Sequence, residues 1–260
     1  MPAELVEAAE ILVGSGAAGW VVDKLLGPSA SALGEQIKVY GTGRFRSVVS
    51  VFATKAETRQ HDLQALPPGF AYQFFQKASF SEDDEFITEC WANLLLSAAT
   101  EYAPRHSIVV DILSQMSADD AKRLDNLVPP TFSISYPCII PSNFRTSVRL
   151  EIAGRLGLPF ENLSRLEAAY RDLVASTTHW PSAVTNVHLP YQGEDGQTKW
   201  FGGGPNGNTS DDVLIRQSLV ERFGIDLTID DSAPNIEGIL ITGLGVEFLA
   251  ICRGVGAERS

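Results

Sequence analysis

"SFSEDDEFITECWANLLLSAAT", residues 79–100, has the most regular pattern in the chain. Its apolar side chains recur at helical spacing and form one wide face, made of Phe86, Ile87, Cys90, Trp91, Leu94, Leu95 and Ala98. Ser81 precedes this face as an N-cap, and Asp84, three residues later, completes a capping-box-like arrangement. The stretch therefore predicts a helix that starts after Ser81 and buries one side in a hydrophobic core.

The acidic run at the start of this helix, Glu82 to Asp84, has two interpretations. It can be a metal or acid–base site, or it can occupy the first turn, where the helix dipole favours negative charge. No histidine accompanies the run, and three consecutive acids on a helix point in different directions, so the pattern favours capping. Asn93 lies at the edge of the apolar face, and we expect its amide to tie the helix to a neighbouring backbone.

Similar periodicity predicts further helices on both sides of this stretch. They are expected at about 3–26, 29–40, 43–60, 105–116, 117–128, 145–156 and 161–176. The helix at 117–128 repeats the capping pattern, because Asp120 follows Ser117 by three residues. Between the helices the pattern indicates a turn at "LPPGF" (66–70), an extended, loop or edge-strand segment at 129–144 and a mobile loop at 177–210.

The C-terminal residues have the order helix, hairpin, helix. The sequence predicts a helix at 211–223, strands at 225–230 and 237–243, and a closing helix at 244–254. This order is typical of the tail of a winged-helix module, with the helix at 117–128 as its candidate first helix. We therefore predict a mostly α fold with a minor β component. An N-terminal helical bundle covers 1–104, and a winged-helix-like portion with inserted loops covers 105–260.

The stretch "ILVGSGAAGW" (11–20) contains the spacing G-x-G-x-x-G. A dinucleotide-binding site needs a strand before these glycines, a helix after them and an acidic residue about 20 positions on. Here the residues before the glycines recur at helical spacing, and the apolar runs of a parallel sheet do not follow. Close helix packing explains the glycines, so no dinucleotide is expected. The glycines of "WFGGGPNGNTSDD" (200–212) lack the Gly-Lys of a P-loop, and we predict no cofactor.

Charge is distributed unevenly along the chain. There are 20 Lys and Arg against 32 Asp and Glu, a formal net charge of −12, which disfavours broad binding of nucleic acid or anionic membrane. Residues 1–80 hold seven of each sign, so residues 81–260 carry the whole excess. A local basic face is nevertheless expected from Lys38, Arg44, Arg46, Lys55 and Arg59. A solvated face on a core helix is the favoured interpretation, and a nucleic-acid or membrane surface is the alternative.

The cysteines and the N-terminus bear on the compartment. Cys90, Cys138 and Cys252 lie far apart without a C-x-x-C pair, which fits a reducing compartment and offers no zinc site. The start "MPAELVEAAE" carries three acids and no base, which is the wrong sign for a signal peptide. The apolar run at 11–22 is too short to span a bilayer. We expect a cytoplasmic protein without a membrane span.

No motif in the sequence indicates catalysis. The four histidines lack H-x-x-x-H spacing, and there is no G-x-S-x-G elbow. One long polar region, 177–200, gathers a candidate polar-aromatic loop cluster of His179, Trp180, His188, Tyr191 and Trp200, together with Glu194 and Asp195. Long loops are often functional, so a hydrolase site there is an alternative, but loop packing is the favoured explanation. We predict no catalytic, cofactor-binding or metal-ligating residue.

The predicted helix at 211–223 is the candidate recognition helix of the winged-helix-like portion. It offers Arg216, Gln217 and Arg222 as candidate interaction residues. Its acids Asp211, Asp212 and Glu221 leave a net charge of −1, which is unfavourable for approaching phosphates. A protein-contact role is therefore favoured over DNA reading.

Four stretches together resemble the bacterial Abi-alpha family. They are "LLGPSASALGEQIKVY", "SEDDEFITECWANLLLSAAT", "SADDAKRLDNLV" and "ILITGLGVEFLAIC", in this order along 25–254. The most specific element is Trp91-Ala92-Asn93-Leu94-Leu95, and Gly243 stands where a proline is common in the family. The family is named for abortive infection, a bacterial response to phage, and the resemblance supplies no catalytic residues.

The resemblance implies a function in phage defence. Combined with the residues above, it predicts a protein that acts by binding a protein partner, with its oligomeric state left open. The first alternative is a nucleic-acid-binding regulator or sensor that uses the local basic face or the helix at 211–223. The second is a hydrolase within 177–200.

Overall fold

The structure of the 260-residue chain is a computed structural model. It describes Leu25 and residues 43–59, 63–128, 146–148, 150, 154, 162–168, 182–203, 209–226 and 235–254. The glycine motif at 11–20, the helix predicted at 29–40 and the segment 129–144 lie outside these residues. So do His179, Trp180 and Lys38. The helices predicted at 145–156 and 161–176 are described only in part, and 146–148 and 163–168 are helical.

The chain divides into two compact units. Unit 1 is Met1–Ala121 with Phe248–Ser260, and unit 2 is Lys122–Glu247. The division falls inside two helices, α8 (Ala118–Leu127) and α12 (Gly243–Cys252), so both helices contribute to both units. The domain boundary expected between residues 104 and 105 stays a prediction.

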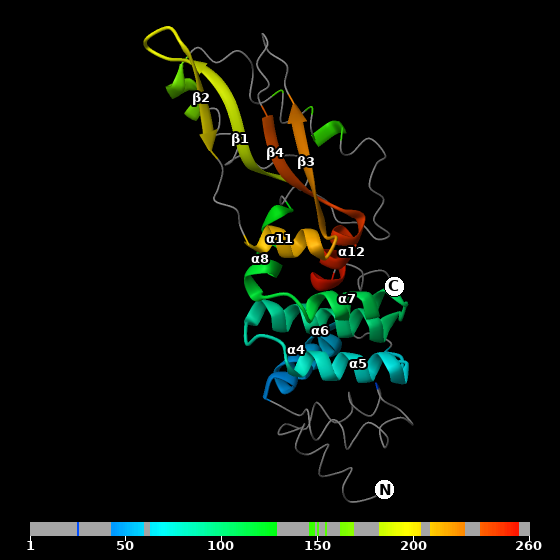
Figure 1. The fold of residues 1–260 in the computed structure, drawn as a ribbon. Coiled ribbons are helices and arrows are strands. Elements are labelled where there is room, and N and C mark those ends of the chain that lie inside the picture. Colours follow the sequence, from blue (N-terminus) through cyan, green and yellow to red (C-terminus); the bar gives the residue numbers. More distant parts are fainter. Residues whose placement is uncertain are drawn as a thin grey trace, which may run out of the picture. The chain divides into compact units, whose positions relative to one another are not determined.

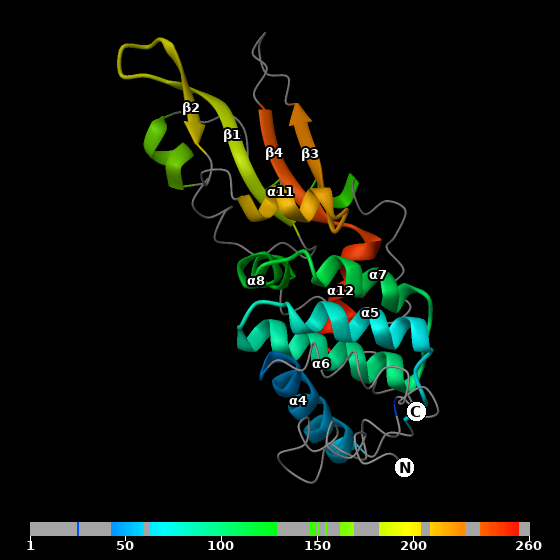
Figure 2. The same ribbon diagram turned by 60° about the horizontal axis from the view of Figure 1, so that its bottom comes forward.

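Unit 1 is built from helices around an apolar core. They are α4 (Gly43–Arg59), α5 (Pro68–Ser79), α6 (Glu85–Thr100) and α7 (Arg105–Leu113), which Figure 1 labels. Helix α5 packs beside α7, as Figure 2 shows. The helices predicted at 43–60 and 105–116 are confirmed. The largest fully buried side chains of these helices include Phe45, Phe52, Phe74, Trp91, Leu94 and Leu95. The rings of Trp91 and Phe74 meet edge to face at 5.3 Å, so α6 and α5 share one core.

Helix α5 is absent from the sequence prediction, which gave only a turn at 66–70. The structure shows a 12-residue helix there, with Pro67 as its N-cap residue and Pro68 at its first position. A proline is tolerated at the first helical position because that residue has no helical partner for an N–H. The pair Pro67-Pro68 therefore begins a helix instead of only ending one. The phenylalanines Phe70, Phe74 and Phe75 then bury one side of it.

Helix α6 forms where it was predicted, but its cap is different. Asp84 is the N-cap residue, and its Oδ1 accepts hydrogen bonds from the backbone N–H groups of Phe86 and Ile87, at 2.8 and 3.3 Å. The assignment of Ser81 as the cap was wrong, because the Ser81 hydroxyl instead donates to Ala78 O at the end of α5. Glu82 accepts a hydrogen bond from Ala118 N at 2.6 Å and so stabilises the start of α8. Capping is thus the structural role of the acidic run.

Two predictions about capping and tertiary contacts are confirmed. Ser117 and Asp120 form the expected capping box at the start of α8, since each side chain accepts a backbone N–H of the other, at 2.9 and 3.2 Å. Asn93 ties α6 to a distant backbone, because its Nδ2 donates to Cys252 O at 2.6 Å. Residues 248–252 of α12 therefore belong to the core of unit 1.

Unit 2 contains a four-stranded antiparallel sheet of order β2-β1-β4-β3, which Figure 1 shows as four adjacent arrows. The strands are β1 (Ser182–Gln192), β2 (Thr198–Gly203), β3 (Val220–Asp226) and β4 (Asn235–Ile241). Helix α11 (Thr209–Arg216) packs against β3. Buried side chains occupy one face, where Val187, Leu189, Ile225 and Ile236 are together.

Two sequence predictions in unit 2 were wrong. Residues 182–203 are not a loop, since β1 and β2 form a hairpin whose turn has Gly196 at φ +73°. The helix predicted at 211–223 ends at Arg216, because Ser218 has φ +59° and the chain then enters β3. Pairing of β3 with the predicted strand β4 overrides its weak helical pattern. The closing helix is confirmed as α12.

The fold class is therefore mostly helical with a small antiparallel sheet. The elements α11, β3, β4 and α12 follow one another in the predicted order. The sheet also includes β1 and β2, which that prediction did not contain. The winged-helix assignment stays a prediction.

A candidate interaction surface on the β1–β2 hairpin

The structure brings His188 and Trp200 together on the β1–β2 hairpin. His188 pairs with Gly202 and Pro190 pairs with Trp200, so these four residues share one face of the sheet. The rings of His188 and Trp200 are stacked, with centroids 4.5 Å apart and an interplanar angle of 21°. Both side chains are exposed, Trp200 to 43%. An aromatic stack held on a sheet face and open to solvent is the kind of group that anchors a protein interface.

The remaining residues of the predicted cluster are arranged differently. Tyr191 is on the same hairpin, but it pairs with Lys199 and so lies on the opposite face from Trp200. His179 and Trp180 lie outside the described residues. Sequence reasoning identified the right residue types, but the stacking of His188 on Trp200 depends on the register of β1 and β2. The amino-acid order alone does not give that register.

The polar face continues from the stack onto β4. Asn186 pairs with Glu237, and its Nδ2 donates to Glu237 Oε2 at 3.3 Å. Both residues are exposed. His188 pairs with Asn235 on the same face, which connects the stack to this amide–carboxylate pair. We name Asn186, His188, Trp200 and Glu237 the hairpin surface.

At the turn of the hairpin, Asp195 is kept ionised. Its carboxylate accepts the Gln197 N–H at 3.2 Å and contacts Lys199 Nζ at 3.1 Å. The hydrogen bond from Gln197 and then that from Lys199 hold the pKa of Asp195 below its ordinary value. Lys199 is thus paired within the turn and does not make this region basic.

The basic face predicted in the N-terminal part is only partly present in the structure. On α4, Arg46 is exposed and Arg44 is half-buried. Lys55 is paired with Glu89 of α6 at 2.6 Å, which neutralises it. Lys38 and the side chain of Arg59 lie outside the described residues.

The three candidate residues of the predicted recognition helix do not lie on one helix. Arg216 is in the last turn of α11, Gln217 follows that helix, and Arg222 lies on β3. Arg222 contacts Asp212 at 2.7 Å. Their neighbour Asp211 is buried and makes two hydrogen bonds with Arg123, at 2.8 and 3.3 Å. Two of the acids that made the predicted helix unfavourable for DNA, Asp211 and Asp212, therefore act as partners of arginines.

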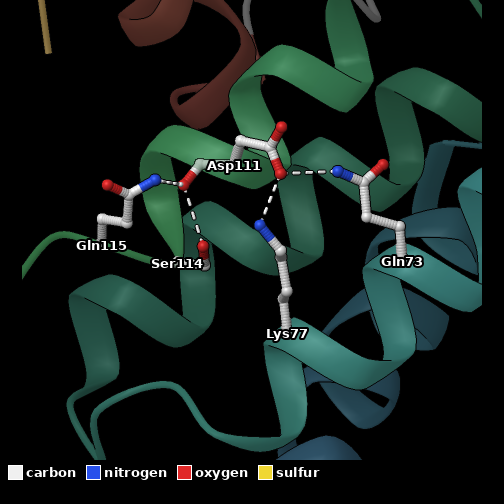
Figure 3. Close-up of polar contacts among 5 residues, drawn as sticks. All are labelled: Gln73, Lys77, Asp111, Ser114 and Gln115. Atoms are coloured by element: carbon white, nitrogen blue, oxygen red, sulfur yellow. Dashed lines mark hydrogen bonds and ion pairs between the residues drawn. The ribbon is translucent and has the colours of Figure 1, made fainter.

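A polar cluster that the sequence analysis missed connects α5 and α7 (Figure 3). Asp111 Oδ1 accepts hydrogen bonds from Gln73 Nε2 at 2.6 Å and from Lys77 Nζ at 2.5 Å. The backbone carbonyl of Asp111 accepts from Ser114 Oγ and Gln115 Nε2. Gln73 and Lys77 are one turn apart on α5. Because the sequence analysis did not predict α5, it did not place these two side chains beside one carboxylate. With both donors on one carboxylate oxygen, the cluster holds the two helices together.

A second missed feature is the pair formed by half-buried Ser97 and buried His106. Ser97 Oγ lies 3.0 Å from His106 Nε2, and the imidazole stacks on Tyr102 and meets Phe70 edge-on. His106 Nδ1 lies 3.0 Å from both the N and the O of Ala103. The pair joins α6 to α7.

His106 should make stability depend on pH. Burial is the main reason that the pKa of His106 is lowered, and the Arg105 charge adds to this, against the opposing effects of Ala103 and Glu101. The unfolded chain then binds the proton more readily, so stability is full above about pH 6.5 and falls as the pH drops below that value.

Urea unfolding at pH 7.5 and at pH 5.5 measures this dependence. We expect H106Q to weaken it, whereas H188Q, which changes an exposed histidine, should leave it unchanged. An unaltered pH dependence in H106Q would contradict the assignment.

The structure defines a mostly helical protein with a small antiparallel sheet and an exposed aromatic stack. A family model described as "Abortive infection alpha" matches residues 44–184, which is more than half of the chain. The chain therefore belongs to the Abi_alpha family, as its sequence motifs predicted. No curated protein and no solved structure matches the chain.

The matched residues include α4 to α8 and end within β1. All four residues of the hairpin surface therefore follow the matched region, as does the closing stretch ending in α12. Within the described ranges, no group of three or more metal-binding side chains comes together. Each helix in the described part of the chain is too short or too polar to cross a bilayer.

Proposed function

We propose that this protein acts in abortive infection, in the cytoplasm of a bacterium, by binding a protein partner through the hairpin surface and not by catalysis. Membership of the Abi_alpha family supports the phage-defence context. The observation that carries the mode of action is the exposed stack of Trp200 on His188. Tryptophan is enriched among the residues that dominate binding energy at protein interfaces.

The position of Trp200 within the sheet supports this proposal. Trp200 lies on a strand whose neighbour β1 is also paired with β4, and its ring is fixed by His188. A side chain that is already ordered loses little conformational entropy when a partner binds. The buried residues Val187 and Leu189 on the other face hold the strand in place.

The charge of unit 2 supports a protein partner over nucleic acid. Residues 122–247 hold ten Lys and Arg and 15 Asp and Glu. Arg222 and Lys199 are paired with Asp212 and Asp195. Phosphate binding needs cations that are available to the backbone of the nucleic acid. The order α11, β3, β4, α12 supports a winged-helix-like description of this part, used for protein contact.

Trp200→Ala should abolish or strongly reduce protection against phage. Truncation of an interface hot spot costs about 2 kcal/mol or more, which is roughly a 30-fold loss of affinity. The measurement is phage plating on cells that carry the wild type, W200A or H188A, with protein levels and melting temperatures matched.

Leu150→Ala provides the control, because Leu150 is also an exposed apolar residue of unit 2, at 68%. L150A is expected to keep full protection. Equal protection by W200A and the wild type would overturn the proposal that the hairpin surface carries the function.

The alternative is a nucleic-acid-binding regulator or sensor. The observation in its favour is that Arg46 is exposed beside half-buried Arg44 on α4. Fluorescence anisotropy with DNA and RNA, at low and at physiological salt, tests it. Binding that weakens steeply with salt and is lost in R44E/R46E would favour this alternative over protein binding.

A further inference from the structure

The hairpin surface is a strip with an aromatic group near one end and a carboxylate near the other. Pro190 pairs with Trp200, and Asn186, four residues earlier on β1, pairs with Glu237. From strand geometry, the two ends are separated by about 16 Å, counting four residues along β1 and two strand spacings across the sheet. About five residues of extended chain span that distance. The strip therefore fits a short extended peptide.

The charges along the strip are negative. Glu237 is exposed and is hydrogen-bonded to the uncharged amide of Asn186. Glu194 is exposed at the turn of the hairpin. The cations closest in sequence to the strip are paired, Lys199 with Asp195 and Arg222 with Asp212. A partner segment of positive charge is complementary to this face.

The Trp200 ring suits the same partner chemistry. Tryptophan binds cations over its ring face more strongly than the other aromatic side chains do. Arginine also stacks on aromatic rings through its planar guanidinium group. His188 occupies one face of the Trp200 ring, and the 43% exposure of Trp200 leaves part of the indole open to a ligand.

We propose that the hairpin surface binds an extended, arginine- or lysine-containing segment of the protein partner, with one cation over Trp200 and a second at Glu237. This inference rests on the proposed function, since it specifies the chemistry of the partner at the same surface. Asn186 lies between the two positions and offers an amide to the backbone of the bound segment.

A peptide titration of the full chain tests this inference. The probes are a fluorescein-labelled peptide of alternating Gly and Arg, the same peptide with Glu in place of Arg, and oligo-dT of similar length. Binding is followed by anisotropy at low and at physiological salt. The wild type should bind the Arg peptide with saturation and should not bind the Glu peptide or oligo-dT.

The variants separate specific binding from attraction to an acidic protein. W200A does not change the charge of the protein, and it should lower the affinity for the Arg peptide by roughly 5- to 30-fold. W200F should retain most of that affinity. E237Q should weaken binding and reduce its salt dependence more than E167Q, which removes another exposed carboxylate of unit 2. W200F and E237Q keep the test valid if W200A does not fold.

Any one of three results would overturn the inference. The first is that W200A binds the Arg peptide as tightly as the wild type does, and the second is that E237Q weakens peptide binding no more than E167Q does. The third is that the wild type binds oligo-dT in preference to the Arg peptide. Its failure is distinct from failure of the proposed function. If W200A abolishes phage protection without lowering the affinity for the Arg peptide, the inference is wrong and the proposed binding function stands. If W200A loses the peptide and keeps protection, the proposed function is wrong.

Discussion

Trp91→Ala is expected to destabilise the protein by about 3–5 kcal/mol. The Trp91 side chain has 0% exposure, and its ring meets Phe74 of α5 edge to face at 5.3 Å. Removing the indole leaves a cavity where α5 and α6 share their core. Urea unfolding followed by circular dichroism measures the change, and the midpoint should fall with little change in slope.

Trp91→Phe is the matched variant for this prediction. In the described structure, the Trp91 indole N–H is buried without a hydrogen-bond partner, which is unfavourable. W91F keeps an aromatic ring against Phe74 and removes that N–H, so it should cost much less than W91A. If W91A melts at the wild-type temperature, Trp91 is not part of the core and becomes a candidate binding residue.

Gly245→Ala should also be strongly destabilising, by about 1–3 kcal/mol or more. A Cβ at Gly245 would lie 2.1 Å from Leu219 O and 2.7 Å from Ile241 Cγ1. The Leu219 carbonyl cannot move freely, because it accepts hydrogen bonds from Thr242 N at 3.0 Å and Thr242 Oγ1 at 3.1 Å. The first turn of α12 approaches the start of β3 too closely for any side chain.

Gly69→Ala is the control, since Gly69 is also a helical glycine and a Cβ there would meet nothing within 4 Å. G69A should be neutral or slightly stabilising, because alanine favours the helix by up to about 1 kcal/mol. Thermal unfolding of both variants distinguishes close packing from helix propensity. Equal melting temperatures for G245A and the wild type would contradict the close approach of α12 to β3.

Much of the helical part could be predicted because its signals are local. The 3.6-residue spacing gave α6, and the Ser117–Asp120 spacing gave the cap of α8. For α6, Ser81 was the predicted cap, but Asp84 is the N-cap residue and the Ser81 hydroxyl donates to Ala78 O at the end of α5, a helix that was not predicted. Helix α5 was missed because Pro67-Pro68 signals a turn as readily as a helix start.

The candidate site was only partly predictable, because it depends on pairing between strands. His188 and Trp200 were selected as residue types, but their stacking follows from the β1–β2 register. Glu237 joins them through the β1–β4 register. It lies 51 positions from Asn186 in the sequence, and β2, α11 and β3 come between them. Residues 220–223 of β3 lay in the predicted helix at 211–223, and their pairing with β4 makes them part of a strand. The pattern of residues along one sequence does not show which distant strands pair.

Photo-crosslinking at Thr198 tests the central claim most directly. Thr198 is exposed, pairs with Gln192 and lies two residues from Trp200 on the same face of the hairpin. A benzophenone side chain at position 198, irradiated in phage-infected cells, is expected to crosslink the protein to another protein, and W200A in the same chain should abolish the product. A crosslink to nucleic acid, or a protein crosslink that W200A leaves unchanged, would contradict binding of a protein partner through the hairpin surface.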